Sequence, residues 1–295
     1  MKIIVDSGST KTDWRIATDD GCVCDITTHG INPAVQDCAH VLEVVAGQLA
    51  GQLLAHGLFY KSLDGMLHTS DSTLLYIYYY GAGCIAPFSD TVIEALSQTF
   101  GENAHIEVAT DLLGAARALC QREEGIACIL GTGSNSCLYN GERVVMNTPP
   151  LGYILGDEGS GAVLGRKFLS ALFKGSLPET LREEFVRTTG MDKAEVIGEV
   201  YRGASPNRFL ASVSHFVADH ITIPELRDMV VSNFRDFFRV NVVRYGRPDL
   251  PVGTVGSIAY IYRDLLAEAA TKEGLTMGKI VCKPLDGLSK YHAEY

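Results

Sequence analysis

Short apolar runs alternate with amphipathic runs along the first third of the chain. Consecutive apolar residues predict buried strands, and apolar residues three and four positions apart predict helices that bury one face. We expect strands over residues 3–5, 14–17, 22–28, 74–80 and 106–109. We expect helices over residues 36–54, 90–100 and 112–120. Strands that alternate with helices predict an α/β layered fold.

The pattern restarts after residue 125. An apolar strand over residues 126–130 runs into a turn of small residues, and segment 128–134 is similar to segment 3–9. A polar hairpin segment follows in both places. The likeness predicts two related domains that each present a glycine turn, although so short a match also arises by chance.

The rest of the chain completes a two-domain organisation, as its length of 295 residues suggests. Residues 160–245 have a largely helical pattern, interrupted at glycines and prolines. Strands are expected over residues 252–255 and 279–282, with a helix between them over residues 259–272. We therefore expect an N-terminal domain of residues 1–115, on which residues 283–295 pack back, and a C-terminal domain of residues 116–282 with a helical insertion.

Composition narrows the classes of function. The 35 acidic side chains outnumber the 25 basic ones, for a formal net charge of −10. A general binder of nucleic acid or of an anionic membrane needs a basic face, so both classes are excluded. The eight cysteines form no CxxC pair and have no metal-ligand spacing with the histidines, which indicates reduced thiols in a cytoplasmic protein. We see no signal-peptide pattern and no uncharged apolar run near the roughly 20 residues that span a bilayer.

The first glycine turn follows the first strand. Asp6 ends that strand, and the turn continues with Gly8, Ser9, Thr10, Lys11 and Thr12. Backbone N–H groups in such a turn converge on phosphate oxygens, hydroxyls add donors, and lysine supplies a positive charge. A carboxylate repels phosphate, so Asp6 is interpreted as a partner of Mg²⁺ through water. The alternative is an ordinary hairpin with a hydroxyl-rich tip.

Two further glycine turns lie at strand ends. The second contains Gly131, Thr132, Gly133 and Ser134, and it lacks both the GxGxxG fingerprint and the P-loop order. The third contains Gly253, Gly256 and Ser257, between a strand and a helix. Two such turns can clamp a polyphosphate from opposite sides while the third receives the adenosine. By itself, the third turn is more typical of a plain strand-to-helix connection.

Asp111 lies where an expected strand passes into an expected helix. This is the position at which α/β proteins gather ligands. A carboxylate there can take the proton of a substrate hydroxyl as its oxygen attacks phosphorus, which typically accelerates a reaction about 10²–10⁴-fold. The alternative is that Asp111 is the N-cap of the helix, worth about 1 kcal/mol.

Three other polar residues are candidates for binding a sugar or a metal. Asp157 and Glu158 stand between glycines before a long helical pattern, where acids also stabilise a helix start. Asp157 can accept hydrogen bonds from sugar hydroxyls, and Glu158 can act at the metal or cap the helix. Asn32 offers a donor and an acceptor on a rigid turn, and a plain Asx turn is its default interpretation.

These motifs together resemble the actin-like ATPase and sugar kinase superfamily. Residues 6–12 resemble its first phosphate motif, residues 131–134 its second, and residues 253–257 its adenosine motif. The pair of segments 129–135 and 155–160 resembles the BadF/BadG/BcrA/BcrD ATPase family, and within it the N-acetylglucosamine kinases. The likeness runs from the N-terminus to about residue 170 and resumes near residue 250.

The resemblance implies two ribonuclease-H-like domains with ATP and Mg²⁺ in an interdomain cleft that closes on a sugar. It implies that Asp111 is the base for the sugar hydroxyl and that Asn32, Asp157 and Gly152 bind the sugar. Phosphoryl transfer then depends mainly on positioning and charge stabilisation. The expected partners are ATP and a small sugar, and a homodimer is left open.

One departure concerns the choice of sugar. The eukaryotic-type kinases carry Gly-Gly-Trp-Gly before the GDEGS segment, whereas this chain has Pro149, Pro150, Leu151 and Gly152. Two prolines remove two N–H donors, and leucine does not stack as tryptophan does. The acceptor therefore stays open among N-acetylglucosamine, N-acetylmuramate, glucosamine and other hexoses.

Two other functions stay open at this stage. One is an ATPase activator of a radical dehydratase, which holds an Fe–S cluster across a dimer through cysteines. The other is a nucleotide-dependent binding module without a sugar substrate.

Overall fold

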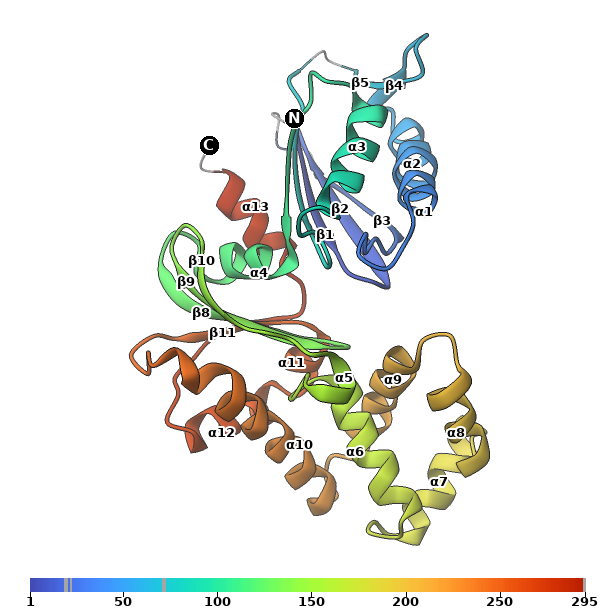
Figure 1. Ribbon diagram of the computed structural model, residues 1–295, viewed down its shortest axis with the longest axis vertical. Helices are drawn as coiled ribbons and strands as arrows, with labels where there is room; N and C mark the ends of the chain where they lie inside the picture. The colour runs from blue at the N-terminus through green and yellow to red at the C-terminus, as the bar shows by residue number, and fades with distance from the viewer. Residues whose placement is uncertain (19–20, 22, 71–72, 294–295) are drawn as a thin grey trace. The chain divides into compact units, whose positions relative to one another are not determined.

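The computed structural model describes residues 1–18, 21, 23–70 and 73–293 (Figure 1). The chain divides into two compact units, Met1–Gln121 with Pro284–Tyr295, and Arg122–Lys283. Cys22, the first residue of the strand expected over residues 22–28, therefore lies outside the described residues. The last two residues of the expected C-terminal segment, 294 and 295, lie outside them as well.

The first unit is a five-stranded sheet covered by helices on both faces. Its strands are β1 (Lys2–Ser7), β2 (Lys11–Ala17), β3 (Val23–His29), β6 (Tyr76–Gly81) and β7 (His105–Thr110), with a separate hairpin of β4 (Phe59–Lys61) and β5 (Leu67–Thr69). Its helices are α1 (Cys38–Leu42), η1 (Glu43–Leu49), α2 (Ala50–Ala55), α3 (Ser89–Phe100), α4 (Asp111–Cys120) and α13 (Leu285–Ala293). The strand order is β3-β2-β1-β6-β7.

Alternation along β1 explains why both faces of this sheet are covered. Ile3 and Val5 point into a core with α1, η1, α2 and α3, whereas Ile4 points into a smaller core with α4 and α13. The buried Trp14 of β2 donates its Nε1–H to Thr28 Oγ1 at 2.8 Å, so its one polar group is satisfied. Both layers thus hold β1 rigidly at the centre of the sheet.

The second unit has a sheet of the same order. Its strands β8 (Glu124–Leu130), β9 (Ser134–Asn140), β10 (Val144–Thr148), β11 (Val252–Val255) and β12 (Met277–Val281) follow the order β10-β9-β8-β11-β12. In each sheet the first three strands in the chain form an antiparallel meander, and two parallel strands follow on the other side. The shared topology confirms the internal repeat predicted from segments 3–9 and 128–134.

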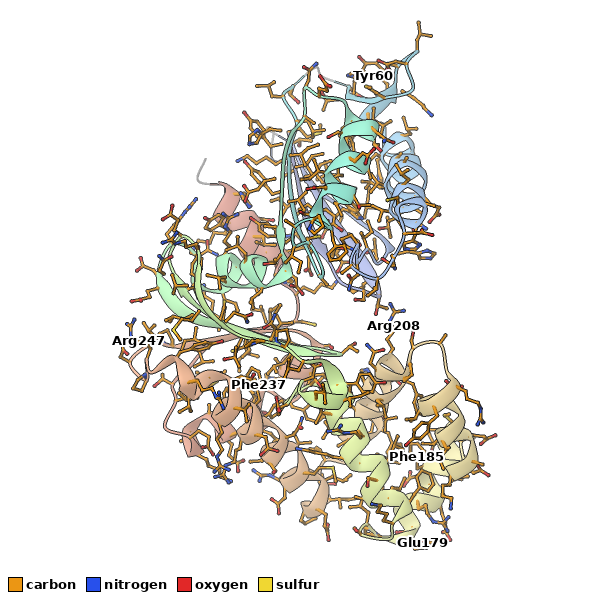
Figure 2. All side chains as sticks on the ribbon, in the orientation of Figure 1. Tyr60, Glu179, Phe185, Arg208, Phe237 and Arg247 are labelled. Atoms are coloured by element: carbon orange, nitrogen blue, oxygen red, sulfur yellow. The ribbon has the colours of Figure 1, made fainter. Side chains whose placement is uncertain are left out.

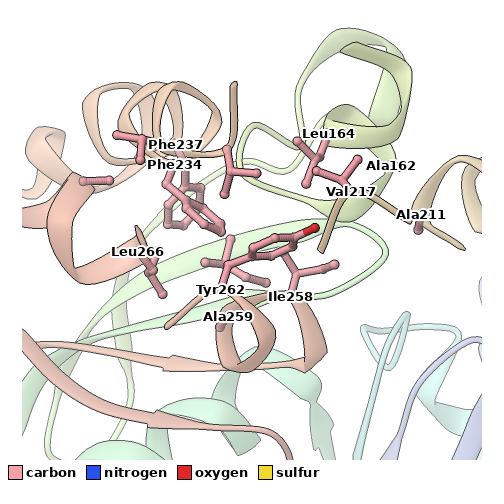
Figure 3. Packing of buried hydrophobic residues seen from close by; sticks show 14 of the residues in the cluster. Ala162, Leu164, Ala211, Val217, Phe234, Phe237, Ile258, Ala259, Tyr262 and Leu266 are labelled. Atoms are coloured by element: carbon pink, nitrogen blue, oxygen red, sulfur yellow. The ribbon is translucent and has the colours of Figure 1, made fainter. Parts of the chain in front are cut away.

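Helices form the large core of the second unit. They are α5 (Gly152–Leu155), α6 (Gly161–Phe173), α7 (Glu179–Thr189), α8 (Lys193–Arg202), α9 (Pro206–Asp219), α10 (Pro224–Phe237), η2 (Phe238–Val242), η3 (Val243–Tyr245), α11 (Ser257–Ile261) and α12 (Arg263–Lys272). Tyr262 packs edge-on against Phe234 with ring centroids 6.2 Å apart (Figure 3), and Phe185 lies among the helices of the insertion (Figure 2). The helical pattern predicted over residues 160–245 is confirmed, with Pro206 and Pro224 as first residues of their helices.

One helical run has the length and composition of a membrane span. This run is Cys38–Ala55, made of α1, η1 and α2 in succession, and it is 18 residues long. Val41, Val45 and Leu49 are fully buried and pack in the core of the first unit, while Glu43 on the other face is exposed. The run therefore behaves as the amphipathic core helix expected over residues 36–54.

Two features escaped the sequence pattern. The β4–β5 hairpin and the edge strand β10 are short, and their exposed residues carry no regular alternation. Tyr60 at the hairpin is exposed and stacks on His68 (Figure 2). Such short edge strands depend on pairing with a neighbour rather than on their own periodicity.

Candidate functional site

The ends of three parallel strands define the site in the first unit. In the register of the sheet, Ser7 of β1 stands beside Gly81 of β6, which stands beside Thr110 of β7. The first glycine turn leaves the sheet after Ser7, and Asp111 follows Thr110. The strand ends that carry them are therefore two strand spacings apart, about 10 Å, along one edge. Carboxyl ends of parallel strands are the usual ligand position in α/β folds.

The first turn is a tight β-hairpin between β1 and β2. The Gly8 N–H donates to Lys11 O at 3.0 Å, and Gly8, Ser9 and Thr10 are exposed. Thr12, which we expected at the phosphate, is instead buried, and its Oγ1 lies 2.7 Å from Ser7 Oγ. Its hydroxyl therefore supports the turn from inside, and Gly8, Ser9 and Thr10 form the exposed tip.

The charges around this turn are distributed in pairs. Lys11 Nζ forms an ion pair with Asp13 Oδ2 at 2.9 Å, and Asp13 also accepts from Thr27 Oγ1 at 2.8 Å. Asp6 is half-buried at the end of β1, opposite Asp13 in the register. Mg²⁺ is usually held by one or two carboxylates together with substrate phosphates and waters, so one strand-end carboxylate fits that cation.

The loop that carries Asn32 packs directly on the first turn. Gly30 is buried so close that a Cβ there would lie 2.4 Å from Gly8 O, and its N–H donates to Thr10 O at 3.2 Å. Asn32 Nδ2 donates to Ser9 Oγ at 3.2 Å. Asn32 Oδ1 accepts from the Ala34 N–H at 3.2 Å, so the expected Asx turn is present as well.

Residues without a sequence signal support this loop. Gln36 accepts a hydrogen bond from the Asn32 backbone N–H and donates to Gly30 O, and His40 Nε2 lies 3.1 Å from Gly30 O. Ser7 Oγ donates to Ile31 O at 3.0 Å. Each contact joins residues that the local pattern assigns to separate elements, so sequence reasoning missed all of them.

Asp111 begins helix α4 but does not cap it. The N-cap is Thr110, whose Oγ1 accepts from the Leu113 N–H at 3.2 Å, so capping as the role of Asp111 is wrong. Asp111 Oδ1 accepts a hydrogen bond from the adjacent Leu112 N–H at 2.8 Å. Burial raises the pKa of its carboxyl, and these backbone hydrogen bonds partly oppose the rise. A raised pKa brings a carboxylate closer to the range of a general base.

Cys84 is a neighbour of Asp111 that the sequence did not indicate. Burial, together with the negative charge of Asp111, raises the pKa of its thiol to about 12. The thiol is therefore neutral at physiological pH and adds no charge to this edge.

The second glycine turn lies on the start of helix α6. The Gly131 N–H donates to Gly133 O at 3.0 Å and closes the turn. The first two N–H groups of the helix, from Gly161 and Ala162, donate to Gly131 O at 2.9 Å and to Thr132 O at 3.2 Å. The turn and the helix therefore form one hydrogen-bonded piece.

Asp157 reaches back to this turn from the loop before α6. Its carboxylate lies against the turn, since a Cβ on Gly133 would lie 3.0 Å from Asp157 Oδ2. Burial raises the pKa of the carboxyl, and the charge of Glu158 adds to the rise. The backbone of Asp157 has φ +54°, in the left-handed region that Asn and Asp adopt more readily than other residues with a side chain.

Capping as the role of Asp157 or Glu158 is wrong. The N-cap of α6 is Ser160, whose Oγ accepts from the Val163 N–H at 3.1 Å. Glu158 Oε2 instead accepts from Asn241 Nδ2 of η2 at 3.3 Å.

The third glycine turn contains Gly253, Gly256 and Ser257, and its Gly256 packs against the base of the second turn. A Cβ on Gly256, which has φ +129°, would lie 2.2 Å from Leu130 O, at the base of the second turn. Ser257 is exposed at the start of α11. Gly253 is buried inside β11 between β8 and β12, so only its neighbours reach the strand end. Gly152 is exposed at the start of α5, with φ +75°.

Among residues 1–18, 21, 23–70 and 73–293, no group of three or more His, Cys, Asp or Glu side chains is arranged to hold a metal ion.

Solved structures similar to this chain span its whole length. It is 46% identical to the candidate N-acetylglucosamine kinase of Porphyromonas gingivalis, with a TM-score of 0.90 over 100% of this chain and 99% of that one. It is 21% identical to the candidate N-acetylglucosamine kinase of Chromobacterium violaceum, with a TM-score of 0.75 over 98% of each chain. It is 15% identical to the ethanolamine utilization protein EutJ of Carboxydothermus hydrogenoformans, with a TM-score of 0.54 over 97% of this chain and 86% of that one.

No family model and no curated protein matches the chain. The second and third structures show a shared fold alone. Together the likenesses confirm the predicted α/β fold of two domains, which is that of actin-like ATPases and sugar kinases.

Proposed function

The chain belongs to the family of the candidate N-acetylglucosamine kinase of Porphyromonas gingivalis, and we propose that it is an ATP-dependent sugar kinase. Its acceptor is an amino sugar, N-acetylglucosamine or a related hexose. The observation that carries the proposal is 46% identity over 100% of this chain and 99% of that one. The narrower BadF/BadG/BcrA/BcrD assignment rests on segments 131–135 and 156–160 and is part of the proposal.

ATP binds through the three glycine turns. The exposed tip of the first turn, Gly8, Ser9 and Thr10, and the second turn, Gly131 to Ser134, hold the phosphates. Lys11 supports the first turn, since its ammonium is paired with Asp13, and Thr12 supports it from inside. Gly256 and Ser257 contact the adenosine, and Gly253 lies in the strand that leads to them, paired with β8. When bound, Mg²⁺ beside Asp6 neutralises phosphate charge.

Asp111 is the general base of the reaction. Its carboxylate takes the proton of the acceptor hydroxyl, whose oxygen bonds to the γ-phosphorus while the bond from that phosphorus to the ADP oxygen breaks. Burial favours this role because it raises the pKa of the Asp111 carboxyl, which makes its carboxylate a stronger base than a solvated one. Asn32, Asp157 and Gly152 bind the sugar.

An ADP-release assay tests the function. Purified protein with Mg·ATP is supplied in turn with N-acetylglucosamine, N-acetylmuramate, glucosamine, N-acetylmannosamine and glucose. We expect sugar-dependent ADP release with at least one amino sugar. Nucleotide binding without phosphorylation of any sugar in the panel would contradict the proposal and favour a nucleotide-dependent binding module.

The cytoplasm is the proposed location because ATP is available there and because Cys84 is a buried free thiol.

A further inference from the structure

Helix α10 and the helical turn η2 that continues it lie along the loop before α6, all within the second unit. Asn233 Nδ2 of α10 donates a hydrogen bond to Ser160 O at 3.3 Å. One turn later on the same helix, the fully buried Phe237 (Figure 3) lies against the backbone of Gly159. A Cβ on Gly159 would lie 2.7 Å from the Phe237 Cβ. Two residues of the helix therefore hold two successive residues of the loop.

A π-helical turn brings a third residue onto the same face. Residues four apart on an α-helix advance by about 40° around its axis, so the line through Asn233 and Phe237 drifts away from the loop. The η2 turn is π-helical, and its wider turn rotates each residue by less. Asn241, four residues after Phe237, faces the loop again, and its Nδ2 donates to Glu158 Oε2 at 3.3 Å. Single π-turns inside helices are rare and occur frequently at functional sites.

The peptide group between Ser160 and Gly161 connects this helix face to the second glycine turn. Its carbonyl accepts from Asn233 Nδ2, and its N–H donates to Gly131 O at 2.9 Å. The next N–H of α6 donates to the turn as well. A hydrogen bond accepted by the carbonyl of an amide polarises that amide and strengthens its N–H as a donor. Asn233 is therefore separated from the turn by one peptide group.

The stability of the fold alone does not favour an asparagine at position 233. The side chain of Asn233 is fully buried, and its Oδ1 has no hydrogen-bond partner among the residues that the structure describes. Val230 and Phe234, beside it on the helix, lie in the apolar core. A buried amide oxygen without a partner loses its hydration without compensation, which a leucine of similar size would avoid. An amide kept at this cost, one peptide group from the turn, indicates a role at the turn.

We propose that Asn233, supported by Phe237 and Asn241, is a positioning residue for the phosphate-binding conformation of the second turn. The inference rests on the proposed function, since that function assigns residues 131–134 to the phosphates of ATP. Asn233 fixes the peptide group of residues 160–161, whose N–H holds the turn in its closed conformation before nucleotide binds. A turn that is already ordered binds phosphate more tightly, because no ordering cost remains at the binding step.

Asn233→Leu separates this role from a purely structural one. The substitution removes the contact with Ser160 and the unpartnered oxygen together, at nearly constant volume. We expect a Tm equal to or above that of wild type, and a Kd for Mg·AMPPNP and a KM for ATP about 3–10-fold higher, the effect of one lost hydrogen bond. The kcat at saturating ATP should stay near the wild-type value. A lower Tm with unchanged AMPPNP affinity would mean a structural role and overturn the inference.

Hydrogen–deuterium exchange follows the turn in the protein without nucleotide. The N–H groups of Gly161 and Ala162 donate to the turn, so they should exchange faster in Asn233→Leu than in wild type. Unchanged exchange at residues 131–134 and 161–162 overturns the inference, whether or not nucleotide binds. Asn233→Ala removes the same amide without adding a branched side chain, and it is measured in the same two ways if the leucine variant does not fold.

Ser232→Leu is the matched control, because it places a leucine one residue away on the exposed side of α10. It should leave AMPPNP affinity and exchange at the turn unchanged, and changes as large as those of Asn233→Leu would overturn the inference.

Failure of the inference and failure of the proposed function give different results. If the wild type phosphorylates a sugar but Asn233→Leu equals it in AMPPNP affinity and exchange, only the positioning role is refuted. If AMPPNP binding weakens and exchange rises in Asn233→Leu while the wild type phosphorylates no sugar of the panel, only the kinase assignment is refuted.

Discussion

Asp111→Asn is the substitution that separates chemistry from folding at this site. Asparagine has nearly the same shape, and its Oδ1 can still accept the Leu112 N–H that Asp111 accepts at 2.8 Å. Thr110 continues to cap α4 through the Leu113 N–H. The local structure should therefore survive, while the basic oxygen is lost.

The expected effect follows from the role of Asp111. Loss of a positioned general base typically reduces turnover about 10²–10⁴-fold, which corresponds to about 3–5 kcal/mol of barrier. ATP affinity should stay within a few-fold of wild type, because Asp111 is two strands away from the first turn. Turnover is measured by coupled ADP release with the best sugar of the panel, and affinity by calorimetry with Mg·AMPPNP.

The pH dependence gives a second signature. Burial raises the pKa of Asp111 in the folded protein, so wild-type kcat/KM should fall as the pH drops through that raised value, where the base becomes protonated. The Asp111→Asn variant should lack this limb.

The stability of the wild-type fold should fall with rising pH, whereas kcat/KM rises. An acid whose pKa is raised by folding destabilises the fold once it ionises, so stability is lost as the pH rises through the folded pKa. Asp111→Asn should therefore have an equal or higher Tm than wild type at neutral pH, with the gain vanishing in acid.

The control is Asp90→Asn, an exposed acid in the first turn of α3. It should leave turnover near the wild-type value. Turnover of Asp111→Asn within about tenfold of wild type would remove Asp111 from the mechanism.

Substitutions at three further positions test the supports of the turns. Gly30→Ala places a Cβ 2.4 Å from Gly8 O, so it should displace the first turn, destabilise the protein by about 1–3 kcal/mol and raise the KM for ATP; an unchanged KM would show that this packing is unimportant. Gly256→Ala adds strain at φ +129° and places a Cβ 2.2 Å from Leu130 O. It should lower the free energy of unfolding, measured by denaturant titration, by about 1–3 kcal/mol or more. A smaller loss would contradict this close approach. Ser160→Ala removes the cap of α6 and should cost about 1 kcal/mol, whereas Ser160→Thr, which keeps the hydroxyl, should cost less; equal losses would argue against capping.

The sequence predicted the alternation of strands and helices, the amphipathic run that spans residues 38–55 in the structure, and the repeat of a strand with a glycine turn. These features depend on the local periods of strands and helices, which neighbouring residues determine by themselves. The strand-end positions of Asp6 and Asp111 were also predictable, because a charged residue after an apolar run marks the end of a buried strand.

Only the tertiary structure decided what each polar side chain touches. Thr110 and Ser160 cap the two helices for which the sequence offered Asp111 and the acids Asp157 and Glu158 as caps, and Thr12 turns inward to Ser7. The hydrogen bond of Asn32 to Ser9 and the approach of Asp157 to Gly133 join segments that sequence periodicity treats as independent. A side chain chooses among several chemically equivalent partners by distance and orientation, and these exist only once the sheet register and the helix packing have brought the segments together.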